Sequence, residues 1–89
     1  MAEPGYRYVF APRAVRDLER LPEAVAAACV EFIAGDLRTD PHRIGKPLRG
    51  RLAGLRSARR GPYRIIHRID DGARLLEIVH IEHRAHAYR

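Results

Sequence analysis

Arginine side chains are concentrated in one short stretch of this 89-residue sequence. Between Leu55 and Ile69 the chain carries five arginines, at positions 56, 59, 60, 64 and 68. Guanidinium groups this close repel one another unless an anion lies among them, and their planar fork can bind a phosphate through two hydrogen bonds. The stretch therefore predicts a site for an anionic ligand.

A second group of reactive side chains lies near the C-terminal end, where His83, Arg84 and Tyr88 fall within six positions. If this segment forms a helical turn, Arg84 and Tyr88 are four residues apart and share one face. An imidazole with a pKa near ~6.5 can donate or accept a proton at cellular pH. The segment thus combines a cation, a phenol and a group that can transfer protons.

Positive charge is unevenly distributed along the chain, which has a formal net charge of +6. Residues 1–37 carry four Lys/Arg and six Asp/Glu, a balance of −2, whereas residues 38–89 carry thirteen and five, a balance of +8. A basic half of this kind favours a polyanionic partner, and nucleic acid above all. An anionic membrane is the weaker alternative, because no basic helix with a bulky apolar face is visible.

Length and composition indicate one globular domain spanning residues 1–89, with 46 % hydrophobic and 31 % charged residues. The single cysteine, Cys29, excludes an internal disulfide and a thiolate metal cluster, and its small apolar neighbours predict that it is buried. We expect neither a metal nor a cofactor, because no His/Asp/Glu group has metal-ligand spacing. No segment approaches the ~20 apolar residues of a membrane span, so a cytoplasmic location is expected.

The hydrophobic patterns predict one strand, two helices and three further strands. Alternation predicts a strand over 6–10, and prolines at 12 and 22 begin two helices, the second reaching Leu37. The Gly61-Pro62 turn divides the arginine stretch into two strands, and the turn at 70–72 leads to a buried strand over 74–81. This order predicts an α+β domain, with a small antiparallel sheet (β-α-α-β-β-β) and an N-terminal helical hairpin packed on one face.

Residues 39–54 connect the second helix to the arginine stretch and are rich in Gly and Pro, which predicts a long loop. A loop of this length in a short chain is often functional. This one carries Lys46, Arg49 and Arg51, which either contact nucleic acid or form a solvated surface.

Three motifs together resemble the RelE/ParE superfamily of bacterial toxins. They are KPLxG at 46–50 with Leu52 and Gly54 after it, SARRGxYR at 57–64, and HRxxxY at 83–88. Over nearly its whole length the chain is most similar to the RelE-like mRNA interferases of type II toxin–antitoxin systems. The resemblance implies a RelE-like fold and a metal-independent endoribonuclease that enters the ribosomal A site, cleaves mRNA and inhibits translation. It also implies a cognate antitoxin that holds the toxin in a hetero-oligomer.

The resemblance also implies roles for individual residues. Arg64 matches the arginine that contacts the scissile phosphate, Arg84 matches the one on the leaving-group side, and Tyr88 matches an aromatic that stacks on a nucleotide. Arg59 would join Arg64 in the catalytic electrostatics, and Lys46 and Arg56 would more loosely supply the remaining positive field. The candidates for RNA or ribosome contacts are Lys46, Arg49, Arg51, Arg56 and Arg60.

Cleavage by the RNA's own 2′-hydroxyl needs a base for that proton, cations for the phosphorane and an acid for the leaving 5′ oxygen. Several family members place a second Lys or Arg where this chain has Ser57, and arginine is a poor base because its pKa exceeds ~12. His83 is therefore a candidate for proton transfer, whereas His67 shares the parity of core residues in its strand and is expected to be packed inside. The general base is not assigned.

Two other functions fit the same sequence features. One is a ParE-like toxin that binds and inhibits DNA gyrase, for which Arg84 and Tyr88 would be unnecessary. The other is a small basic RNA-binding module without catalysis, whose affinity would fall steeply with salt concentration.

Overall fold

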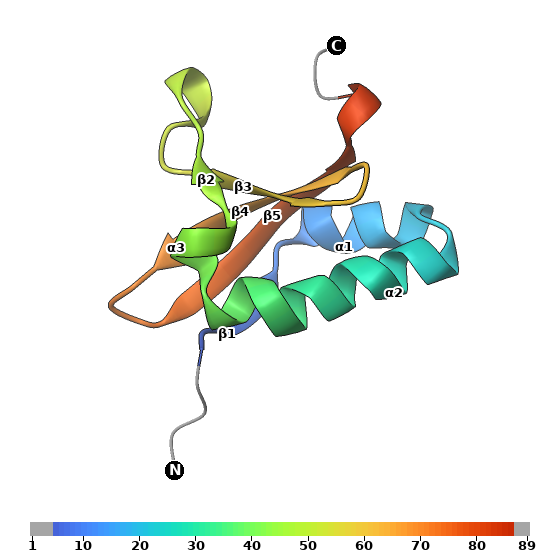
Figure 1. Ribbon diagram of the computed structural model, residues 1–89. Coiled ribbons are helices and arrows are strands. Elements are labelled where there is room, and N and C mark those ends of the chain that lie inside the picture. Colours follow the sequence, from blue (N-terminus) through green and yellow to red (C-terminus); the bar gives the residue numbers. More distant parts are fainter. Residues whose placement is uncertain (1–4, 87–89) are drawn as a thin grey trace.

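A computed structural model describes residues 5–86 and consists of one five-stranded sheet with helices packed on one of its faces (Figure 1). In chain order the elements are β1 (Arg7–Phe10), α1 (Pro12–Arg20), α2 (Glu23–Phe32), the π-helical turn η1 (Ile33–Leu37), α3 (Pro41–Ile44), β2 (Lys46–Pro47), the 3₁₀ turn η2 (Gly50–Leu52), β3 (Arg56–Arg60), β4 (Tyr63–Asp70), β5 (Leu75–His83) and the 3₁₀ turn η3 (Arg84–His86). The expected α+β class, the helical hairpin and the central β-hairpin are confirmed.

The sheet differs in two respects from the antiparallel arrangement that the sequence predicts. Its strand order is β1-β5-β4-β3-β2, and β1 pairs with β5 in parallel, Arg7 opposite Leu75 and Phe10 opposite Ile78. Only a tight turn forces antiparallel pairing, and β1 is connected to β5 through all the other strands and the helices. The second difference is β2, which arises within the predicted loop because Lys46 and Pro47 pair with Ser57 and Arg56 of β3.

Both long helices begin next to a proline, as the sequence predicts. Pro12 is the first residue of α1, and Pro22 precedes α2, whose first turn carries Glu23 beside the positive end of the helix dipole. Helix α2 continues into the π-helical turn η1, and its apolar stripe contributes Cys29, Ile33 and other residues to the core. Cys29 is 1 % exposed, which confirms the expected burial, and that burial raises the pKa of its thiol.

A β-bulge in β5 determines which side chains of that strand face the core. Ile66 pairs with His80, but the next residue, His67, pairs with Ile78, so one residue of β5 is extra. The alternation along β5 therefore shifts by one position. Ile81 on one side of the bulge and Ile78 on the other are both buried, whereas His80 is turned away from the core.

His67 is fully buried, as its strand parity predicts, and it packs against the start of β2. Its Nδ1 lies 2.9 Å from the carbonyl oxygen of Ile65 and acts as the donor, while Nε2 has no partner among the described residues. A Cβ atom on Gly45 would lie 2.9 Å from the imidazole Cε1 atom, closer than real Cβ contacts. The buried ring therefore requires glycine directly before Lys46 and fixes the path of the chain into β2.

Burial lowers the pKa of His67 below its ordinary value of 6.5, and nearby Arg56 lowers it further. Below about pH 6.5 the unfolded imidazole binds a proton more readily than the folded one. The contribution of neutral His67 to stability is thus complete above that pH and is lost progressively below it. We expect urea denaturation to show less stability at pH 5.5 than at pH 7.5, with a smaller difference in His67→Phe. An equal pH difference in the two proteins would contradict this assignment.

Candidate nucleic-acid interface

Lys46, Arg59 and Arg64 line one cavity of about 350 Å³ on the sheet. They come from three strands, β2, β3 and β4, and the other lining residues are Ile44, Pro47, Leu48 and Ser57. The structure thus brings together three of the sequence-predicted cations around a space that can receive an anionic group. Ser57, the position that departs from the family pattern, lies in the same wall.

Strand register explains why these side chains converge. Arg59 is directly opposite Arg64, Arg64 is directly opposite Glu82, and Lys46 is directly opposite Ser57. Residues in such rows project from the same side of a sheet. We call this side the outer face, and it carries Ser57, Arg59, Arg64 and Glu82. The other side of the sheet faces the core, which Ala58, Ile65 and Ile81 enter.

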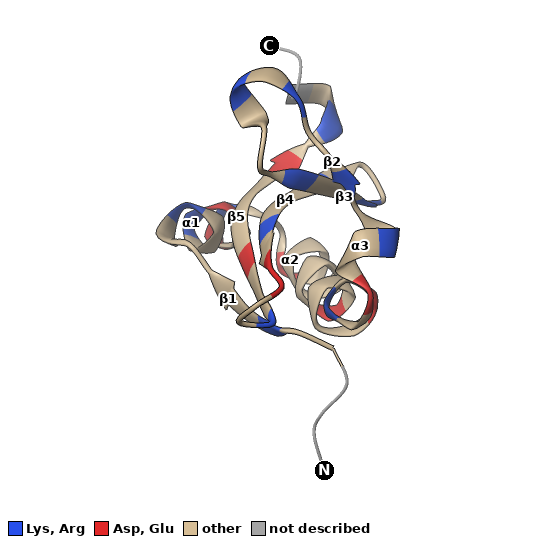
Figure 2. Cartoon of the chain, turned by 90° about the vertical axis from the view of Figure 1, so that its left-hand side faces the viewer, with Lys and Arg blue, Asp and Glu red and all other residues tan. Residues whose placement is uncertain are grey.

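Two basic segments project beyond the sheet on the side away from α2 (Figure 1). One is the loop that contains η2, where Arg49 and Arg51 are exposed and Gly50 and Gly54 have φ angles of 66° and 94° that favour glycine. The other is η3, where exposed Arg84 donates its backbone N–H to the Pro62 carbonyl at 2.6 Å. Figure 2 shows Lys and Arg on both segments and on β3. Tyr88 lies outside the described residues.

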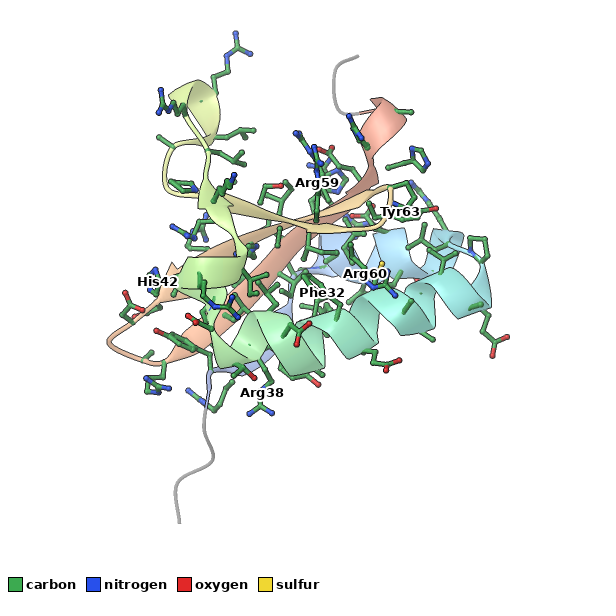
Figure 3. The ribbon with its side chains drawn as sticks, viewed as in Figure 1. Phe32, Arg38, His42, Arg59, Arg60 and Tyr63 are labelled. Atoms are coloured by element: carbon green, nitrogen blue, oxygen red, sulfur yellow. The ribbon has the colours of Figure 1, made fainter. Side chains whose placement is uncertain are left out.

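Three predicted site residues lie on the helix-bearing side of the sheet instead. Arg60 lines cavities beside α2, and Figure 3 shows it below the sheet, with Arg59 above. Arg56 donates from Nη2 to the carbonyls of His42 (3.0 Å) and Gly45 (2.8 Å), so it holds the α3–β2 connection rather than facing the cavity. His83 follows the parity of core residue Ile81. The structure therefore separates these side chains from Arg59 and Arg64.

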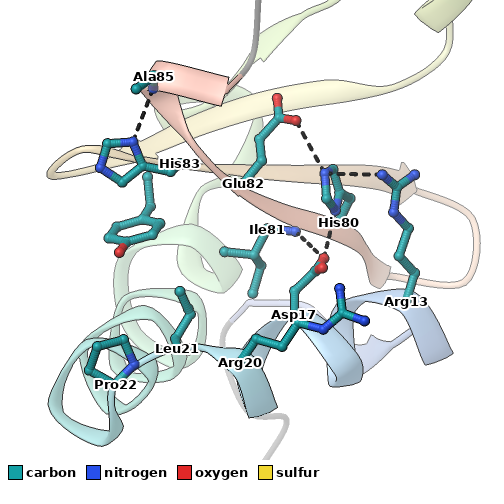
Figure 4. A pocket seen from close by; sticks show the side chains of 11 residues that line it. Arg13, Asp17, Arg20, Leu21, Pro22, His80, Ile81, Glu82, His83 and Ala85 are labelled. Carbon is teal, nitrogen blue, oxygen red and sulfur yellow. Dashed lines mark hydrogen bonds and ion pairs between the residues drawn. The ribbon is translucent and has the colours of Figure 1, made fainter. Parts of the chain in front are cut away.

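The surroundings of His83 are those of a packed ring. Its imidazole lies edge-on to Tyr63 with ring centroids 5.1 Å apart, and its Nδ1 accepts a hydrogen bond from the Ala85 N–H at 3.0 Å (Figure 4). Both rings line a cavity of about 750 Å³ between α1 and β5. Because His83 shares the side of Ile81 on β5, it lies across the sheet from the Arg59–Arg64 pair.

The same cavity contains a polar cluster that sequence reasoning missed. His80 Nδ1 lies 2.6 Å from Asp17 Oδ2, and His80 Nε2 lies 3.1 Å from Glu82 Oε2 and 3.3 Å from Arg13 Nη2 (Figure 4). Asp17 also accepts the Ile81 N–H at 2.9 Å, where β5 extends past the end of β1. The sequence signal was the pair of polar residues at alternate positions, His80 and Glu82, in an otherwise apolar strand.

Neither a metal centre nor a membrane span is evident in residues 5–86. Within that range no three His, Cys, Asp or Glu side chains are grouped so that they could hold a metal ion. None of the helices in the same range combines the length and apolar composition needed to cross a bilayer.

Comparison with known proteins agrees with this architecture. Residues 8–88 match the family model described as the ParE toxin of the type II toxin–antitoxin system parDE. Over 84 residues, or 94 % of this chain, it is 56 % identical to Toxin RelE and 51 % identical to Toxin RelG of Mycobacterium tuberculosis, covering 87 % and 97 % of those proteins.

A solved structure shows the same fold at substantial sequence identity. It is the toxin–antitoxin complex RelBE2 from Mycobacterium tuberculosis, which matches with a TM-score of 0.86 and 50 % identity over 90 % of this chain and 99 % of the solved one. The chain therefore belongs to the RelE/ParE superfamily of type II toxin–antitoxin toxins, as a RelE-like member.

Proposed function

We propose that the protein is a ribosome-dependent endoribonuclease that cleaves mRNA in the A site and thereby inhibits translation. The observation that carries this proposal is the cavity in which Arg59, Arg64 and Lys46 converge on the outer face. Three cations from three adjacent strands form a preorganised site for a phosphate, and such preorganisation stabilises charge that develops in a transition state. The similarity to Toxin RelE supports the same function.

The proposed reaction is an attack of the ribose 2′ oxygen on the adjacent phosphorus. A planar guanidinium can bind two phosphoryl oxygens at once, and Arg64, flanked by Arg59 in register, is placed for that contact. Lys46 adds a point charge from the far wall of the cavity. Arg84 and Tyr88 complete the site in this proposal, at the leaving oxygen and on a neighbouring base. The products are a 2′,3′-cyclic phosphate and a 5′-hydroxyl.

A cognate antitoxin is the second partner in this proposal. The similar RelBE2 structure is a toxin–antitoxin complex, which supports a hetero-oligomer for this chain as well. Its action on ribosomes would place the toxin in the cytoplasm.

The test is to incubate the protein with ribosomes programmed with a defined mRNA and to map the new ends by primer extension. We expect cleavage within the A-site codon, a cyclic phosphate at the 3′ end of the upstream fragment, and no cleavage of the same mRNA without ribosomes. The cyclic phosphate identifies attack by the 2′-hydroxyl, because direct attack by water on the phosphorus would not form it.

Intact mRNA on programmed ribosomes would contradict the proposal. A gyrase supercoiling assay with the same preparation then tests the ParE-like function, which the description of the matching family model favours. Salt-dependent RNA binding without inhibition of gyrase would indicate a binding module instead.

A further inference from the structure

The proposed cleavage requires a group that accepts the proton of the 2′-hydroxyl, and the two arginines of the cavity, Arg59 and Arg64, do not supply one. Arginine remains protonated in proteins. His83, the candidate from sequence, packs against Tyr63 on the other side of the sheet. A proton acceptor is therefore to be sought among the outer-face residues next to Arg64.

Glu82 is the carboxylate in register with Arg64. The two residues are directly opposite each other on adjacent antiparallel strands, in the row that Arg59 continues on β3. Directly opposed side chains have Cβ atoms about 4.5–5.5 Å apart. Because β5 is bulged beside His80, the apolar residues that precede and follow the bulge keep their side chains in the core, while Glu82 remains on the outer face. Glu82 thus lies directly beside Arg64, the residue that is proposed to bind the phosphate.

A partly buried pair of side chains, His80 and Asp17, contacts one end of this carboxylate. Glu82 Oε2 lies 3.1 Å from His80 Nε2, and His80 Nδ1 lies 2.6 Å from Asp17 Oδ2 on α1. The side chains of His80 and Asp17 are only 17 % and 14 % exposed, and that of Glu82 is 24 % exposed. Arg13 also approaches His80 Nε2, at 3.3 Å. The contact with His80 is made by Oε2, so the second carboxylate oxygen, Oε1, is the atom assigned to the substrate in the proposal that follows.

We propose that Glu82 is the general base of the RNA cleavage and that His80, fixed by Asp17, is its positioning residue. The inference rests on the proposed endoribonuclease function. Glu82 Oε1 takes the proton of the 2′-hydroxyl as the O2′–P bond forms and the P–O5′ bond breaks. The leaving 5′ oxygen takes a proton from solvent, and Glu82 then returns its proton to solvent. No proton is consumed overall, and no other reactant is needed.

The experiment measures single-turnover cleavage on programmed ribosomes for the wild type and for Glu82→Gln. Glutamine keeps the shape and a hydrogen bond to His80 but cannot accept the proton. General base catalysis contributes about 10²- to 10⁴-fold, so we expect a loss of at least about 10²-fold in the cleavage rate, with ribosome affinity changed by less than about 3-fold. The rate of the wild type should rise with pH over the acidic range, and that rise should be absent in Glu82→Gln.

Glu77→Gln is the matched control. Glu77 lies on the same strand and also pairs with an arginine of β4, Arg68, at 2.8 Å, but at the other end of the hairpin. Its substitution is expected to leave the cleavage rate unchanged. Glu82→Asp retains a carboxylate with shorter reach, and we expect it to keep the acidic pH dependence at a reduced rate.

The outcomes separate this inference from the proposed function. A wild type that does not cleave mRNA overturns both. An active wild type with an equally active, folded Glu82→Gln overturns the inference alone. If Glu82→Gln does not fold, as circular dichroism would show, Glu82→Asp decides: an unchanged rate in that variant overturns the role of Glu82, and a reduced rate that keeps the acidic limb supports it.

Discussion

Arg64→Ala is expected to lower the single-turnover rate of mRNA cleavage on the ribosome by about 10²- to 10³-fold, the typical effect of removing one donor to a charged transition state. Arg64 lies at the centre of the outer-face row between Arg59 and Glu82 and lines the cavity with Lys46. Its guanidinium would meet the phosphorane as negative charge grows on the equatorial oxygens. Binding to the ribosome should change little, because many other basic residues contribute to it. The measurement is the cleavage rate at saturating toxin, with affinity determined separately.

Arg64→Lys sharpens this prediction. Lysine keeps the positive charge but lacks the planar fork that binds two oxygens, so we expect a rate between those of the wild type and Arg64→Ala. Arg68→Ala is the control on the same strand, since Arg68 pairs with Glu77 away from the cavity. Equal losses in Arg64→Ala and Arg68→Ala would show that general positive charge, and not the placement of Arg64, determines the rate.

Leu76→Ala is expected to lower the free energy of unfolding by about 2–5 kcal/mol, as truncation of buried leucines generally does. Leu76 is fully buried in β5, opposite Tyr8 of β1 and Ile69 of β4. The whole free energy of unfolding of a small domain is only about 5–15 kcal/mol, so the variant should be close to unfolding. Urea denaturation followed by circular dichroism gives the value.

Val9→Ala provides the comparison for the stability measurement. Val9 lies in neighbouring strand β1, but its side chain is among the exposed large hydrophobics, at 45 %. Substitution there is expected to change stability by less than about 0.5 kcal/mol, because no cavity forms. Equal losses of free energy of unfolding in Leu76→Ala and Val9→Ala would contradict the placement of the core against β5.

The sequence was sufficient to predict the two long helices and four of the five strands, because prolines, glycines and apolar spacing act locally, whereas α3 and β2 form within a stretch predicted as loop. Alternation along a strand also carries information about the site. Ala58 is buried, and side chains two residues apart share a face, so Arg56 and Arg60 lie on its side of β3 and Arg59 on the opposite one. Of these three, only Arg59 therefore shares the outer face with Arg64, and alternation along the strand gives that division once Ala58 is known to be buried.

Other features depend on contacts that no local pattern records. The parallel pairing of β1 with β5 joins the two ends of the chain, and the bulge in β5 follows from the need to bury Leu76, Ile78 and Ile81 together. That bulge is what turns His80 toward Asp17 and leaves Glu82 beside Arg64. A regular strand over 74–81 predicts neither contact, so the polar cluster could be found only in three dimensions.

The position of β5 between β1 and β4 has a consequence for synthesis of the chain. Arg7 pairs with Leu75 and Phe10 pairs with Ile78, so the first strand made has no neighbour in the sheet until the last strand has left the ribosome. Arg64 likewise acquires Glu82 beside it only then. Contacts between such distant segments form late and slowly. A nascent copy of this protein therefore carries the cations of β2, β3 and β4 for a time without the completed sheet beside them.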